Sequence, residues 1–151
     1  MQKNPISLPD NPHKAWVIFS GQTDIFWLRA FKPGFRHCFV LMNDGQCWIS
    51  YDPMSHYTDI TVHHMPCFFD MPRWLAGRGH IVVEANMNKA HKRPAPFGIF
   101  SCVEAVKRVL GIHSALVITP WQLFRYLDKQ NNAQSITATK EIPHGKSCIT
   151  A

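Results

Sequence analysis

A cysteine lies where a helix is expected to begin. In the stretch SCVEAVKRVLG (101–111), Ser101 and Glu104 form the capping-box pattern, and Gly111 holds the position of a C-terminal cap. Cys102 therefore falls in the first helical turn, where unpaired backbone N–H groups and the positive end of the helix dipole stabilise a thiolate. At about 100° per residue, Cys102 belongs to the apolar arc of this helix, so its sulfur should face a sheet. The position favours a reactive thiol.

A base for this thiol is expected from a hairpin. Two strand-like segments, 35–42 and 46–52, are joined by Asn-Asp-Gly. A two-residue turn at Asp44–Gly45 would pair Met42 with Cys47 and, further along, His37 with Asp52. Directly opposed side chains share a face, with Cβ atoms about 5 Å apart. The spacing therefore predicts an imidazole–carboxylate pair, which a register slip of one residue would separate.

The same residues also allow a structural interpretation. A cysteine on an apolar helix face often serves only as a small core residue, and a His–Asp pair often forms a solvated contact. The residue pattern alone leaves catalysis and a structural role both open. The remaining cysteines are poor nucleophile candidates, because two lie on the hairpin face opposite His37 and two lack an activating neighbour: Cys38, Cys47, Cys67 and Cys148.

Composition limits the other classes of site. The chain has 151 residues, 46% hydrophobic and 17% charged, which predicts one globular domain over 1–130 followed by a polar tail over 131–151. Five cysteines without a CxxC pair argue against a disulfide framework and for a reducing compartment. His64 and Cys67 have ligand spacing, but a second ligand pair is missing. We therefore expect no metal and no cofactor.

The charge pattern limits the partners. The formal net charge is +6, but the basic residues are scattered, and the densest cluster, 88–94, has no interleaved aromatic residues. We expect no sequence-specific nucleic-acid binding. No apolar run reaches the roughly 18 residues of a transmembrane segment, and the first residues lack the apolar core of a secretion signal. These features predict a protein that is cytoplasmic as synthesised, or that is incorporated into a phage particle.

The order of elements predicts the fold class. Strand patterns fill the first two thirds of the chain, and helix signals dominate the last third, where Thr119 with Gln122 repeats the capping box around Pro120. This order is typical of an α+β fold with an antiparallel sheet. The expected strands are 15–21, 35–42, 46–52, 58–65 and 80–87, with short helical segments at 23–31 and 70–79.

Two segments resemble a known family. SCVEAVKRVLGI resembles the nucleophile helix of the NlpC-type thiol hydrolases of the papain-like superfamily. RHCFVLMNDGQCWISYD is similar to the strand, turn and strand that carry the family's catalytic histidine and polar third residue. Because histidine precedes cysteine here, the order resembles the circularly permuted branch that includes lecithin retinol acyltransferase-like proteins. The resemblance covers mainly 35–52 and 97–111, and it implies a permuted papain-like fold with an antiparallel sheet packed on a cysteine-bearing helix.

The resemblance implies a role for each site residue. Cys102 would attack an acyl carbonyl, His37 would take and return the proton, and Asp52 would orient the ring. The permuted acyltransferases commonly have a histidine as the third residue, so Asp52 is a departure, although an orienting carboxylate is chemically adequate. If the hairpin register differs from the predicted one, His56 is the substitute. The backbone N–H of Cys102 would be one oxyanion donor, and Gln22 is a candidate for the second.

Three functions follow as hypotheses. The first is a thiol hydrolase that cleaves an amide bond in a peptide or cell-wall substrate, with peptidoglycan favoured and delivery by a phage or secretion particle. The second is a lipid or thioester acyltransferase of the permuted branch. The third is a non-catalytic virion or tail component that keeps the fold and binds assembly partners.

Overall fold

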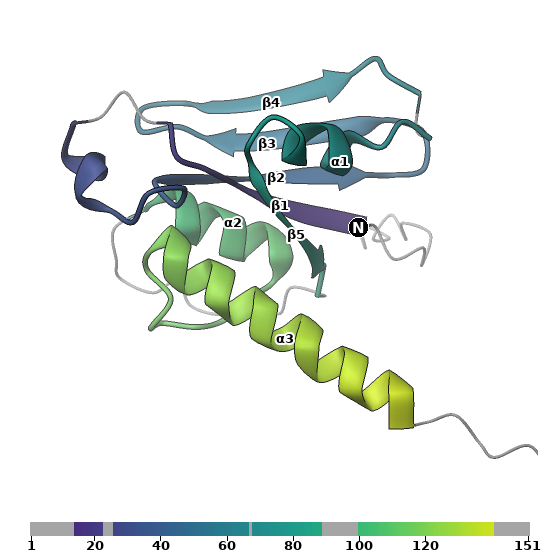
Figure 1. Ribbon diagram of the computed structural model, residues 1–151. Helices are drawn as coiled ribbons and strands as arrows, with labels where there is room; N and C mark the ends of the chain where they lie inside the picture. Colours follow the sequence, from purple (N-terminus) through teal and green to yellow (C-terminus); the bar gives the residue numbers. More distant parts are fainter. Residues whose placement is uncertain (1–13, 23–25, 67, 89–99, 141–151) are drawn as a thin grey trace, which may run out of the picture.

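The computed structural model describes residues 14–22, 26–66, 68–88 and 100–140. Its centre is a five-stranded antiparallel sheet in the order β4-β3-β2-β1-β5 (Figure 1). The predicted α+β class with an antiparallel sheet is confirmed. The strands are β1 (Lys14–Ser20), β2 (His37–Asn43), β3 (Trp48–Pro53), β4 (Thr58–His63) and β5 (Ile81–Asn86).

Helices cover both faces of this sheet. The long helices α2 (Cys102–Leu110) and α3 (Pro120–Lys140) lie side by side below the sheet in Figure 1, whereas α1 (Met71–Ala76) lies in front of it. A 3-10 turn, η1 (Phe26–Ala30), follows β1 within the segment 23–31 that was expected to be helical. None of the described helices has the length and apolar character needed to cross a membrane.

Strand alternation divides the core in two. One set of strand residues packs with α2 and α3, including Val17 and Phe19 of β1 and Cys38 and Val40 of β2. The intervening residues, such as Leu41, pack on the opposite face against α1. This alternation is the period of two expected of a strand whose faces are both covered.

The predicted ends of α2 are confirmed. Ser101 Oγ accepts the backbone N–H of Glu104 at 3.3 Å, and Gly111 closes the helix in the left-handed conformation, with φ 65°. The Glu104 carboxylate does not complete the capping box, because it binds Lys107 at 2.8 Å and Arg108 at 3.2 Å. The side chain of Lys107 is buried as a result and donates to the carbonyl of Val117 at 3.2 Å.

Helix α3 begins as predicted and ends later. Thr119 Oγ1 accepts the N–H of Gln122 at 3.3 Å, and Gln122 Oε1 accepts the N–H of Thr119 at 3.0 Å, which completes a capping box. The helix then continues through Asn131 to Lys140, so it includes the first part of the predicted polar tail. No glycine or proline interrupts this stretch, and Asn131 Nδ2 ties it to the Glu84 carbonyl of β5 at 2.9 Å.

The hairpin register differs from the prediction by two residues. Val40 pairs with Tyr51 and Met42 with Ile49, so the strands are joined by a four-residue loop, 44–47, instead of a two-residue turn. The Asp44 carboxylate causes the change, because its Oδ1 accepts the N–H groups of Gln46 and Cys47, each at 2.8 Å. A shift of two residues moves the pairs along the strands but leaves each side chain on its face.

Candidate active site

The β2–β3 pair brings His37 and Asp52 together. In the observed register Asp52 is diagonal to His37 on the same face, and His37 Nε2 lies 2.6 Å from Asp52 Oδ1. The side chains are largely buried, with 18% and 22% of their surfaces exposed. The expectation that the two residues lie directly opposite each other was wrong. They still meet, because a register shift of two residues leaves both side chains on the same face of the sheet.

Helix α2 brings Cys102 to this pair from the opposite side of the sheet. The thiol is half-buried and its pKa is lowered to about 5, because the Cys38 thiol donates a hydrogen bond to it and His37 adds a hydrogen bond and a positive charge. These contributions outweigh burial, which opposes the thiolate. The three residues expected to act together therefore lie in one chain of contacts, Cys102–His37–Asp52.

The His37 ring carries the matching charge. Burial lowers its pKa, but hydrogen bonds to Asp52 and Cys102 and the negative charges of both raise the pKa to about 9. Between pH 5 and 9 the stable form is therefore a thiolate facing an imidazolium. Cysteine nucleophiles use this ion pair, because the thiolate is the reactive form and the ring can protonate a leaving group.

Sequence analysis missed the contribution of Cys38. Its side chain is completely buried under α2, and burial raises the pKa of the Cys38 thiol well above its ordinary value. The group thus remains a thiol and donates to the Cys102 sulfur. Two predicted features could have revealed it together: Cys102 faces the sheet, and Cys38 lies on the sheet face opposite His37.

The candidate oxyanion donors lie at the start of α2 and just beyond the end of β1. Cys102 is the first residue of α2, and backbone N–H groups in a first helical turn have no intrahelical acceptor. Gln22 lies exposed just beyond β1, whose last residue, Ser20, pairs with His37. The backbone N–H of Gln22 donates to Ser20 Oγ at 3.1 Å, so this residue is part of a turn beside the site.

The other candidate residues lie elsewhere. His56 is exposed in the β3–β4 connection, where its Nδ1 lies 3.1 Å from Ser55 Oγ and its ring contacts the Tyr57 ring edge-on. The Cys47 thiol donates to Asp44 Oδ2 at 3.6 Å within the hairpin loop. Cys67 and Cys148 lie outside the described residues.

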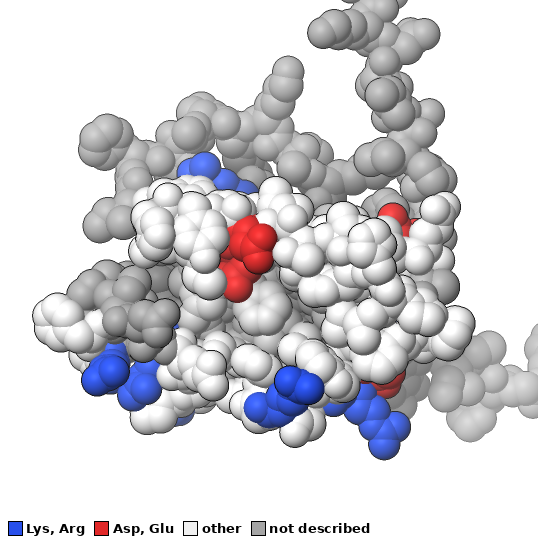
Figure 2. All heavy atoms as spheres, turned by 90° about the horizontal axis from the view of Figure 1, so that it is seen from above, with Lys and Arg blue, Asp and Glu red and all other residues white. Residues whose placement is uncertain are grey.

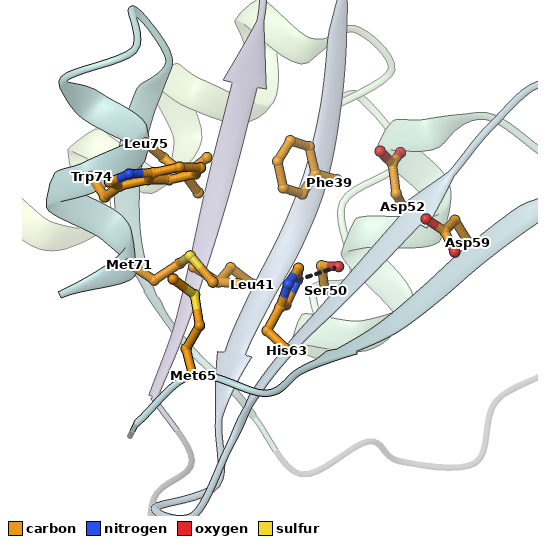
Figure 3. Close-up of a pocket in the computed structure, with 10 residues that line it drawn as sticks. All are labelled: Phe39, Leu41, Ser50, Asp52, Asp59, His63, Met65, Met71, Trp74 and Leu75. Atoms are coloured by element: carbon orange, nitrogen blue, oxygen red, sulfur yellow. Dashed lines mark hydrogen bonds between the residues drawn. The ribbon is translucent and has the colours of Figure 1, made fainter. Parts of the chain in front are cut away.

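A groove adjoins the site on the α1 side of the sheet. Its cavity volume is about 260 Å³, and Asp52 forms part of its wall. Figure 3 shows Asp52 and Asp59 at one side and helix α1 at the other. His63 Nε2 and Ser50 Oγ, 3.0 Å apart, line the cavity between them. The remaining lining is apolar: Phe39, Leu41, Met65, Met71, Trp74 and Leu75.

Within the described ranges, no three His, Cys, Asp or Glu side chains gather in a way that could hold a metal ion. Comparison with protein-family models, curated proteins and solved structures finds no match for this chain.

Proposed function

We propose that this protein is a cysteine hydrolase that cleaves amide bonds through Cys102, His37 and Asp52. The observation that carries the proposal is the convergence of three elements on one ion pair. The start of α2 supplies a thiol with a pKa of about 5, the start of β2 supplies a ring with a pKa of about 9, and β3 supplies a carboxylate 2.6 Å from that ring.

The chemical steps follow from these contacts. The Cys102 thiolate attacks an acyl carbonyl, and the negative oxygen of the tetrahedral intermediate is stabilised by the N–H groups at the start of α2. The His37 imidazolium gives its proton to the leaving amine, and Asp52 holds the ring and its charge. His37, now neutral, then removes a proton from water, which attacks the thioester and releases the acid and the thiolate.

The substrate class rests on the resemblance to the NlpC-type hydrolases in the permuted order. That resemblance favours peptides of the bacterial cell wall, with a phage or secretion particle as the means of delivery. An acyltransferase would use the same thioester and pass the acyl group to a nucleophile other than water. A non-catalytic virion component would form no thioester.

The experiment compares the wild-type chain with Cys102→Ala on purified muropeptides and on acyl thioesters. We expect the wild type to release new amino groups from muropeptides and Cys102→Ala to release none above the uncatalysed rate. Equal release by both proteins, or release by neither, would refute the hydrolase. Transfer of the acyl group from a thioester to an added amine or lipid, without muropeptide cleavage, would establish the acyltransferase instead.

A further inference from the structure

The groove beside Asp52 has the dimensions of a site for one side chain. Its volume of about 260 Å³ lies below the range of pockets that enclose whole small-molecule ligands, about 300–1,000 Å³. Aliphatic, thioether and aromatic groups from β2, the segment after β4, and α1 form most of the wall (Figure 3). These surfaces suit the aliphatic part of a long side chain, called its apolar stem below.

One side of the groove has unbalanced negative charge. Asp52 and Asp59 are directly opposed in the β3–β4 register, an arrangement of like charges that destabilises a sheet unless a cation lies nearby. These two carboxylates have the single positive charge of His37 beside them, and that charge is bound to Asp52. Within the described part of the chain, no lysine or arginine forms an ion pair with either carboxylate.

The hydrogen bonds of the two carboxylates leave room for a cation. His37 binds Asp52 through Oδ1. Among the residues that the structure describes, Asp59 accepts side-chain hydrogen bonds from the Thr61 hydroxyl alone, at 3.2 and 3.3 Å, and this neutral donor does not offset the charge. Seen from above, over the β4 side of the sheet, one acidic group lies near the middle with no Lys or Arg next to it in this view, whereas further acidic groups and the visible Lys and Arg lie toward the edges (Figure 2).

We propose that this groove binds a substrate side chain that has an apolar stem and a terminal ammonium or guanidinium group. The stem packs between Phe39 and α1, and the cation lies between Asp52 and Asp59. Because Asp52 also holds His37, a residue bound in this way lies next to the carboxylate that orients the catalytic ring, and its fit influences which amide is cleaved. The assignment to a substrate residue rests on the proposed hydrolase function, whereas the groove's preference for cations does not.

The test measures binding without turnover. The full chain carries methionine labelled at the ε-methyl carbon and is titrated with n-hexylammonium, 1-hexanol and hexanoate, with NMR signals assigned through Met65→Leu and Met71→Leu. We expect hexylammonium to shift the Met65 and Met71 signals and to bind roughly fivefold more tightly than hexanol, as for one partly exposed ion pair. Hexanoate should bind least.

Charge variants separate the carboxylate from the apolar wall. Asp59→Asn should abolish the preference for hexylammonium over hexanol, and Asp59→Glu should retain it. Asp128→Asn removes an exposed carboxylate of α3 and should leave the preference unchanged. Equal affinity for amine and alcohol in the wild type, or shifts confined to methionines outside the groove, would overturn the proposal. Amine selectivity in a protein that cleaves no amide would keep the groove and refute only the hydrolase.

Discussion

Replacement of Asp52 by asparagine should change the protonation of His37. The ring's pKa of about 9, against an ordinary 6.5, corresponds to roughly 3 kcal/mol in favour of the charged form. Because burial opposes that charge, the hydrogen bond and charge of Asp52 must supply much of the difference, with Cys102 supplying the rest. Loss of a nearby opposite charge lowers a pKa by about 1–3 units. We therefore expect His37 to titrate near neutral pH in Asp52→Asn.

The assay is a pH titration of the His37 ring by NMR, with the signal assigned through His37→Gln. Asp59→Asn is the matched control, because Asp59 lies directly opposite Asp52 but forms no bond to His37. The stabilisation from a raised histidine pKa is complete below pH 6.5 and is lost as the pH rises through about 9. The difference in unfolding free energy between wild type and Asp52→Asn should therefore shrink over that range. An unchanged His37 titration in Asp52→Asn would refute the reasoning.

Three further substitutions test the surroundings of the site. Cys38→Ala should raise the pKa of Cys102 from about 5, because it removes the thiol that donates to the Cys102 sulfur. Cys38→Ser keeps a donor and should raise that pKa less. Alkylation as a function of pH measures both variants, and equal pKa shifts in the two would contradict the role of Cys38. Leu110→Ala should lower the unfolding free energy by about 2–5 kcal/mol in urea denaturation, because this fully buried side chain would leave a cavity; a loss below about 1 kcal/mol would contradict the packing of α2. Gly111→Ala should destabilise more than Gly45→Ala, since both have positive φ but only at Gly111 would a Cβ meet a backbone atom, the Asn88 oxygen at 2.6 Å; equal melting temperatures would contradict this.

The sequence predicted the sheet, the two capped helices and the meeting of His37 with Asp52. These features depend on local patterns: alternation, cap residues and the parity of a hairpin register. The prediction of a two-residue turn was wrong. The Asp44 side chain accepts two backbone N–H groups and so stabilises a four-residue loop, which the turn preference of the Asp-Gly pair does not reveal. Because the register shifted by an even number of residues, His37 and Asp52 still lie on the same face of the sheet and meet.

Contacts between distant elements were less predictable. Cys38 was set aside because it lies on the opposite face from His37, yet that face is the one α2 covers. A lysine is usually exposed, but the aliphatic chain of Lys107 reaches a buried position where Glu104 and the Val117 carbonyl satisfy its charge. The groove depends on the placement of α1 across the sheet, which no local pattern specifies.

The central claim is that Cys38 and His37 together hold Cys102 as a thiolate and that His37 forms the ion pair with it, and cysteine alkylation tests this claim most directly. Wild type and His37→Ala are treated briefly with iodoacetamide from pH 4 to 10, and labelling of each cysteine is resolved by peptide mass spectrometry. We predict half-maximal labelling of Cys102 near pH 5 in the wild type and at higher pH in His37→Ala, in which the Cys38 hydrogen bond remains, with Cys47 as the unactivated internal reference. Labelling of Cys102 with the same pH profile as Cys47, or with a profile that His37→Ala does not change, would contradict the account.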